Sequence, residues 1–189
     1  MRMKGALIAL GIAAMASTAP AAAKEVTVVV DAHSAPWQTG VNKKFGFGLG
    51  DARAPTVVWQ IGLLSGLKLT ISATGRTTTF GGGDAIGPNG IPDWITDRGM
   101  ALFPSYYMSK RDGPIHLNQL VGCFVNADGV IVGQPFAIGS NAVVEIPEGA
   151  SALSLGINDD KFSDNDGALT VTISMADPKV TVESSDAKE

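Results

Sequence analysis

The sequence has few of the residues on which cross-linked, zinc-binding and nucleic-acid-binding proteins depend. Of its 189 residues, one is cysteine and two are histidine, so neither an internal disulfide nor a Cys/His zinc site can form. The 14 basic residues are outnumbered by 18 acidic ones, whereas a broad nucleic-acid-binding surface needs clustered lysine and arginine. We therefore exclude a disulfide scaffold and a structural zinc protein, and we expect no nucleic-acid partner.

Long apolar runs are also scarce, and the one that exists lies at the N-terminus. Residues 1–23 begin with basic Arg2 and Lys4, continue with a short apolar stretch and end in three alanines. That order is typical of an export signal peptide cleaved near Ala23, and the apolar stretch is too short for a stable membrane span. We therefore expect a secreted or periplasmic protein without a membrane span; a retained N-terminal anchor is the alternative.

Sustained helical periodicity is absent from the rest of the chain, and short alternating segments take its place. Glycine (23 residues) and proline (10 residues) are abundant, which favours turns over helices. In residues 67–73, apolar and polar side chains alternate, as in a strand with one buried face. Such segments predict strands at residues 25–31, 56–61, 67–74, 119–126, 142–146, 151–157 and 168–175.

This succession of strands predicts an all-β fold, an antiparallel β-sandwich of the jelly-roll type. We expect the sandwich to occupy residues 24–176 and a charged C-terminal tail to follow over residues 177–189. Two glycine-rich stretches, residues 41–55 and 77–113, carry few strand signals and are expected to form loops at the ends of the sandwich. Cys123 lies in an apolar strand with no nearby histidine to activate it, so we expect a buried, unreactive thiol.

The densest group of polar side chains lies between the last two predicted strands. Nine residues hold four aspartates and two asparagines: Asn158, Asp159, Asp160, Asp164, Asn165 and Asp166. So many oxygen donors on one loop repel one another unless a cation compensates them, and Ca2+ takes six to eight such ligands. An EF-hand is excluded, because aligning its glycine on Gly167 puts Phe162 at the first ligand position and Ile173 where the glutamate belongs. The loop predicts a calcium site of another kind.

Two other interpretations of this loop stay open. One is a solvated hairpin loop in which aspartate and asparagine cap turns through side-chain hydrogen bonds. The other is a pair of catalytic carboxylates, as in a glycoside hydrolase, although two carboxylates on one loop match poorly the opposed positions that such a reaction needs. His33 and His116 have no acidic or serine partner motif, and no nucleophile elbow or His-Glu-x-x-His motif occurs. We therefore expect a protein that is not an enzyme.

Three motifs follow one another in the C-terminal half of the chain. They are an apolar strand before an Asn-x-x-Gly hairpin (residues 120–129), a Pro-x-Gly turn into Leu-x-Leu-Gly (147–156), and Asn-Asp…Asp-Asn-x-Gly before a Val-Thr-Ile strand (158–173). In these motifs the chain resembles the bacterial calcium-dependent galactophilic lectins of the PA-IL type and the related galactose-binding-like sandwich family. The resemblance covers roughly residues 62–175 and is strongest after residue 120.

The resemblance implies a metal site with a defined set of ligands. In such lectins one calcium ion at the end of the sandwich is coordinated directly by two hydroxyl groups of the sugar. Carried over, the side-chain ligands are Asp159, Asp164 and Asn165, and the backbone carbonyls of Thr79 and Phe162 complete the set.

The same resemblance implies a set of sugar contacts. Asp159, Asp160 and Asp164 match positions that meet the sugar beside the ion. On the middle loop (residues 90–97), Asp93 is placed to accept hydrogen bonds from sugar hydroxyls and Trp94 to stack on an apolar sugar face. The histidine and glutamine with which the family grips galactose have no clear counterpart, so the identity of the sugar stays open.

Together these observations predict an exported, non-catalytic, calcium-dependent carbohydrate-binding protein. A shallow site of this kind binds one sugar weakly, so we expect multivalent binding through a homo-oligomer. One alternative is an exported structural or envelope protein in which calcium only staples the loop and no sugar binds. A second alternative is a glycan-processing enzyme with an unrecognised site.

Overall fold

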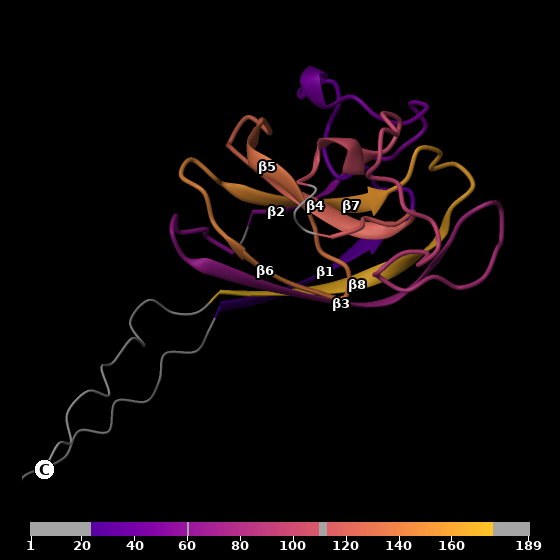
Figure 1. The fold of residues 1–189 in the computed structure, drawn as a ribbon. Helices are drawn as coiled ribbons and strands as arrows, with labels where there is room; N and C mark the ends of the chain where they lie inside the picture. The colour runs from indigo at the N-terminus through magenta and orange to yellow at the C-terminus, as the bar shows by residue number, and fades with distance from the viewer. Residues whose placement is uncertain (1–23, 60, 110–112, 176–189) are drawn as a thin grey trace, which may run out of the picture.

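Two four-stranded antiparallel sheets face each other in the computed structural model, which describes residues 24–59, 61–109 and 113–175 (Figure 1). One sheet holds, in spatial order, β1 (Lys24–Asp31), β8 (Asp166–Met175), β3 (Lys68–Thr78) and β6 (Asn141–Glu145). The other holds β2 (Thr56–Val58), β7 (Ala152–Asn158), β4 (Gln119–Val125) and β5 (Ile131–Ala137). The expected signal peptide (residues 1–23) and tail (residues 177–189) lie outside the described residues.

The strand order is that of a jelly roll, so the predicted fold class is confirmed. Every pair of consecutive strands except β4 and β5 lies in different sheets, which wraps the chain repeatedly around one core. Within β8, Leu169, Val171 and Ile173 are fully buried, whereas the threonines between them point to the outer face. This period of two is the reason why the sequence pattern located the strand.

The two central strands of the second sheet, β7 and β4, are buried on both faces, which the sequence did not indicate. All residues of β4 and β7 are buried. Leu120 and Phe124 of β4 belong to the core between the sheets, whereas Val121, Cys123 and Val125 belong to a separate apolar cluster on the outer face. That cluster is completed by loop residues Trp37, Met108 and Ile115. The long loops are therefore held against the sandwich by a core of their own.

All seven predicted strands are present, with shifted ends, and one strand was missed. β2 ends at Val58, earlier than expected, and β3 extends to Thr78, further than expected. The missed strand is β5, whose Gly133 and Pro135 are signals against a strand. It lies at the edge of its sheet, where a proline without an N–H donor is tolerated.

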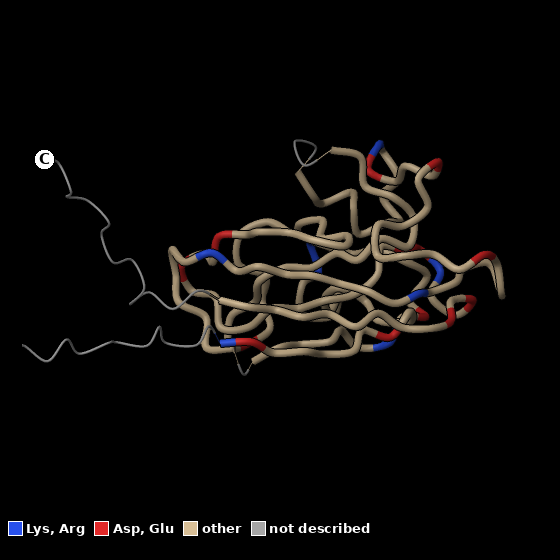
Figure 2. Tube along the Cα trace, turned by 90° about the horizontal axis from the view of Figure 1, so that it is seen from below, with Lys and Arg blue, Asp and Glu red and all other residues tan. Residues whose placement is uncertain are grey.

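The ends of the described chain lie together, far from the acidic loop. Lys24 at the start of β1 pairs with Met175 at the end of β8, whereas the loop of residues 159–165 precedes the opposite end of β8. At about 3.4 Å per residue, ten residues of β8 separate the two ends of the sandwich by about 30 Å. Charged residues lie mainly in loops and at strand ends (Figure 2).

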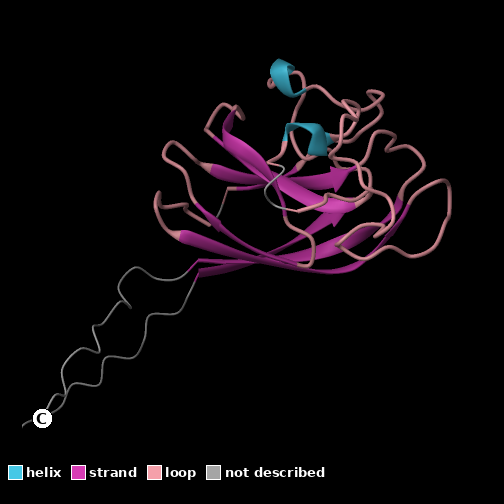
Figure 3. Ribbon diagram, in the orientation of Figure 1, coloured by secondary structure: helices cyan, strands magenta, loops and turns pink. Residues whose placement is uncertain are grey.

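Helical structure in the described residues is limited to two short 3₁₀ segments, η1 (Lys43–Phe45) and η2 (Pro104–Tyr107), both within the loop regions (Figure 3). No helix in the described part of the chain is long and apolar enough to cross a membrane. The described residues of the predicted loops 41–55 and 77–113 are thus mostly irregular, and their placement depends on the outer cluster and on hydrogen bonds.

Cys123 provides a test of the outer cluster. Its side chain is fully buried, and this burial raises the pKa of the thiol to about 12. Because the thiolate is the reactive form, we expect no labelling of the native protein by iodoacetamide at pH 8 and complete labelling after unfolding in guanidinium. Mass spectrometry distinguishes the two states. Native labelling at the rate of a free thiol would show that the loops do not cover this face.

Candidate functional site

The register of β3 and β8 brings two distant segments together at one end of the sandwich. Thr78 pairs with Asp166, so the turn that follows β3 lies beside the acidic loop that precedes β8. The Gly81 N–H donates a hydrogen bond of 2.9 Å to the Asp164 carbonyl. The loop ends at Gly167, where φ is +88° and a Cβ atom would lie 2.5 Å from the Arg76 carbonyl oxygen. Only glycine allows the two segments to approach so closely.

We call the place where the turn after β3 meets the acidic loop the junction. Asp159 is a buried carboxylate in this junction, with only 2% of its surface exposed. It accepts hydrogen bonds from the Thr79 hydroxyl (3.2 Å) and from the backbone N–H groups of Asp160 (2.7 Å) and Lys161 (3.3 Å). Desolvation nevertheless raises the pKa of Asp159 to about 6, which the hydrogen bonds only partly oppose. Among the described residues, no cationic side chain forms an ion pair with it.

Asp164 and Asn165 each have one side-chain oxygen that is buried without a partner. The Asp164 Oδ2 atom is 3.0 Å from Lys161 Nζ, and the Asn165 side-chain amide donates a hydrogen bond of 3.0 Å to the Ala32 carbonyl. The Asp164 Oδ1 and Asn165 Oδ1 atoms are buried and have no hydrogen-bond partner in the described part of the chain. Leaving a buried acceptor unpaired costs about 1–3 kcal/mol, so unpaired oxygens on two neighbouring residues indicate a missing partner. The Asn165 side chain also hydrogen-bonds to Asp159 and helps to moderate its raised pKa.

The two predicted carbonyl ligands lie in turns that border the junction. The Thr79 carbonyl accepts a hydrogen bond from the Gly83 N–H (3.1 Å), and the Phe162 carbonyl accepts one from the Asn165 N–H (3.2 Å). Each carbonyl keeps a second lone pair. The donor set therefore consists of carboxylate, amide and carbonyl oxygens, which suit Ca2+ rather than a transition metal. The described residues contain no group of three or more His, Cys, Asp or Glu side chains that could hold a metal ion, so this donor set has only two carboxylates, those of Asp159 and Asp164.

A third segment, which sequence analysis missed, holds the acidic loop in place. The Asp51 carboxylate accepts hydrogen bonds from the backbone N–H groups of Ser163 (2.9 Å) and Phe162 (3.3 Å). Desolvation acts to raise the pKa of Asp51, but these hydrogen bonds outweigh it and the pKa is lowered. The Leu49 N–H also donates to the Asp160 carbonyl at 2.9 Å. Asp160 thus contacts this segment through its backbone, while its side chain is partly exposed.

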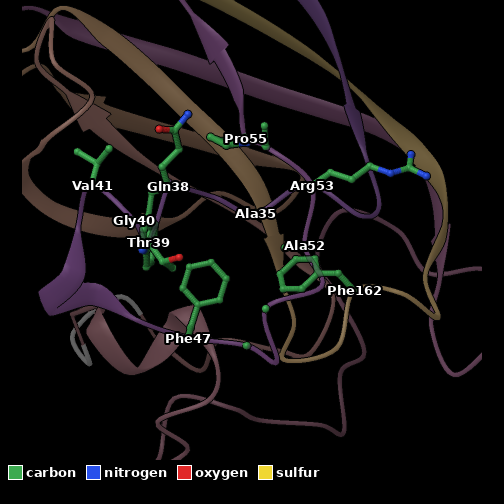
Figure 4. Close-up of a pocket in the computed structure, with 14 residues that line it drawn as sticks. Ala35, Gln38, Thr39, Gly40, Val41, Phe47, Ala52, Arg53, Pro55 and Phe162 are labelled. Atoms are coloured by element: carbon green, nitrogen blue, oxygen red, sulfur yellow. The ribbon is translucent and has the colours of Figure 1, made fainter.

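The buried Phe162 ring packs the acidic loop against the segment of residues 35–55. It lines a pocket of about 320 Å³ together with Phe47, and the two ring centroids are 6.0 Å apart (Figure 4). The pocket is otherwise lined by residues of the 35–55 segment, and none of the other predicted site residues borders it. Phe162 is fully buried, so its ring fixes the position of the carbonyl that faces the junction.

A second groove begins at the junction and runs along the middle loop. It has a volume of about 510 Å³ and is lined by Thr79, Phe80, Gly83, Asp84, Ala85, Ile86, Gly87, Gly90, Ile91, Pro92 and Trp94. Trp94 therefore shares this groove with one predicted cation ligand, Thr79, and has 45% of its surface exposed. Asp93 is exposed but does not line the groove. Phe80, which sequence analysis did not single out, contributes an exposed ring beside Trp94.

His33 has an acidic partner that the sequence pattern did not reveal. Its Nδ1 atom lies 2.7 Å from Asp31 Oδ1, and Arg53 Nη1 lies 3.1 Å from the other oxygen of the same carboxylate. These contacts tie the end of β1 to the segment that carries Asp51.

Comparison with known proteins finds a structural likeness but no matching family. No family model and no curated protein matches this chain. A solved structure described as the EclA N-terminal domain, a PllA-like lectin, aligns with 79% of this chain and 94% of its own length, at 19% sequence identity and a TM-score of 0.42. A likeness at this level carries no functional argument, so function has to be inferred from the residues of the site.

Replacing Asp159 by asparagine separates the effect of its charge from that of its shape. Because the raised pKa means that protonation favours the folded state, the metal-free wild type should lose stability as the pH rises through about 6. In chelator at pH 7, Asp159→Asn should therefore melt above the wild type, and the difference should shrink at pH 5. Thermal unfolding at both pH values measures this. Asp166→Asn is the matched control, because the Asp166 side chain is exposed. If Asp159→Asn melted below the wild type in chelator at pH 7, a raised pKa for Asp159 would be contradicted.

Removing the Asp51 carboxylate should loosen the acidic loop. Asp51→Ala deletes two hydrogen bonds to the loop backbone, so we expect a loss of about 1–2 kcal/mol in the free energy of unfolding. Calcium affinity, measured by isothermal titration, should also fall several-fold because the loop that holds the ligands is less ordered. Asp128→Ala, in the exposed hairpin that follows β4, serves as the control. Equal behaviour of the two variants would exclude this role for Asp51.

Proposed function

We propose that this protein is a calcium-dependent carbohydrate-binding protein without catalytic activity. The observation that carries the proposal is that two neighbouring residues, Asp164 and Asn165, each hold a buried and unpartnered side-chain oxygen, and that the Asn165 side chain also hydrogen-bonds to the buried Asp159 carboxylate. A solvated turn, the simplest alternative, does not account for buried oxygens that lack partners. A hard cation would pair with all three groups and balance the charge of Asp159.

The ligands in this proposal come from two segments, the acidic loop before β8 and the turn after β3. Asp159, Asp164 and Asn165 contribute side-chain oxygens, and Thr79 and Phe162 contribute carbonyls. When bound, Ca2+ would supply Lewis-acid attraction for two neighbouring sugar hydroxyls. These protein groups do not exhaust the six to eight positions that Ca2+ prefers, which leaves positions for the hydroxyls. Carboxylate lone pairs not used by the ion would accept hydrogen bonds from the same hydroxyl groups.

The adjacent groove supports carbohydrate as the ligand. It shares Thr79 with the cation site and presents Trp94, an aromatic side chain of the kind that packs against apolar faces. The arrangement of the acids supports binding rather than hydrolysis. Asp159 and Asp164 belong to the same short loop, whereas glycoside hydrolysis needs two carboxyl groups on opposite sides of the scissile bond.

Export and multivalency belong to the same proposal. Weak calcium sites are filled outside the cytoplasm, where calcium is abundant, which agrees with the signal peptide proposed for residues 1–23. A single shallow site of this kind would bind weakly, and a homo-oligomer would raise the apparent affinity through effective concentration.

Calcium and sugar titrations test the proposal together. At a calcium concentration one hundred times Kd, we expect about 2.7 kcal/mol of added stability, which corresponds to several degrees in Tm. Sugar binding in a glycan screen should require calcium. Asp164→Ala should weaken calcium binding at least tenfold and abolish sugar binding, while Asp166→Ala, in the same loop but with an exposed side chain, should behave like the wild type.

Each alternative function gives a different result in these experiments. Calcium-induced stability without any sugar binding would favour a structural protein with a stapled loop. Release of product from a glycan would favour an enzyme. Sugar binding that persists unchanged in chelator would refute the calcium-dependent mechanism.

A further inference from the structure

Phe80 adopts a backbone conformation that core packing does not explain. Its φ is +58°, which is rare for a bulky residue, and 58% of its surface is exposed. It lies in the turn that the hydrogen bond from Gly83 N–H to the Thr79 carbonyl closes. Strained residues of this kind occur preferentially at functional sites, and here the turn projects an aromatic ring into solvent directly after a proposed cation ligand.

Phe80 and Trp94 form one aromatic surface. Their ring centroids are 5.3 Å apart and their planes are tilted by 35°. The backbone of Trp94 is fixed by hydrogen bonds from its N–H to the Ile91 carbonyl (3.0 Å) and from the Leu117 N–H to its own carbonyl (2.9 Å). A fixed tryptophan thus supports a phenylalanine from a different loop, and both rings remain accessible.

The groove beside these rings is larger than a single sugar ring requires. Its volume of about 510 Å³ falls within the range of sites that enclose ligands of several rings. A sugar that binds the proposed ion through two hydroxyls would occupy the end at Thr79. The remainder of the groove, from Thr79 to Trp94, is continuous with that end and would still be open.

We infer that this groove is a second sugar subsite, in which Phe80 and Trp94 bind the apolar face of the next unit of an oligosaccharide. The inference rests on the proposed function for the first unit. The lining favours a sugar over a purely apolar group, because it combines the two rings, Ile91 and Pro92 with the exposed carboxylate of Asp84. A sugar unit matches this mixture, with its C–H face against the rings and a hydroxyl donating to Asp84. A hydrocarbon would leave that carboxylate against an apolar surface.

The experiment compares ligands of different length in the presence of calcium. The probes are the methyl glycosides of galactose, mannose and fucose, di- and trisaccharides that carry the same terminal sugars, and the matching phenyl glycosides. Isothermal titration should show that the best disaccharide binds about tenfold more tightly than its methyl glycoside. In Phe80→Gly this advantage should disappear, while affinities for calcium and for the methyl glycoside stay unchanged. In Trp94→Ala the disaccharide should lose more affinity than the methyl glycoside does, and calcium affinity should not change. The glycine variant keeps the backbone conformation of residue 80 accessible.

Tyr106→Ala is the matched control, because Tyr106 is an aromatic residue of similar exposure (47%) that does not line the groove. Equal affinities for the disaccharide and the methyl glycoside would overturn the subsite and leave the proposed function standing. A phenyl glycoside that gains as much as the disaccharide, with the same dependence on Trp94, would show an apolar occupant and overturn the inference. Absence of calcium-dependent binding across the whole panel would refute the proposed function and the subsite with it.

Discussion

The antiparallel pairing of β3 with β8 is the interaction on which the candidate site depends. Ten residue pairs, from Leu69 with Met175 to Thr78 with Asp166, fix the register between strands that are nearly 100 residues apart in the sequence. A slip by one residue would exchange the buried and exposed faces of β8 and would separate Thr79 from Asp159. The register is strongly determined because Leu169, Val171 and Ile173 all need the same face. Core packing therefore sets the geometry of the polar site.

The sequence predicts a strand where one face is buried and the other exposed, because apolar and polar residues then alternate along the strand. The alternation in β8 and in β3 identified both strands, and turn residues separated them from their neighbours. β5 failed this test because Gly133 and Pro135 interrupt the pattern, and only its place at a sheet edge makes the proline acceptable. The outer cluster around Trp37 was not predictable either, since its members come from loops that are distant in sequence.

Some residues of the candidate site are likewise marked by a local sequence pattern, whereas others can be recognised only in the folded chain. Asp159, Asp164 and Asn165 are close in sequence, so their density is a local pattern that the sequence alone displays. Asp51 lies more than 100 residues away from the backbone that it binds, and no local signal marks it. Phe80 was missed because a positive φ and an exposed ring are properties of the folded chain. The unpaired oxygens of Asp164 and Asn165, on which the proposed cation site is based, likewise can be recognised only when burial is known.

The pairing of Lys24 with Met175 places both ends of the described chain at one end of the sandwich, whereas the candidate site lies at the other end. Any segment joined before β1 or after β8 leaves the molecule about 30 Å from the acidic loop, on the side that faces away from it. Fusion, immobilisation or attachment to a larger assembly through either end would leave the loop and the aromatic groove pointing outward. The same polarity means that several copies gathered by their ends would present their grooves in one direction, as an array.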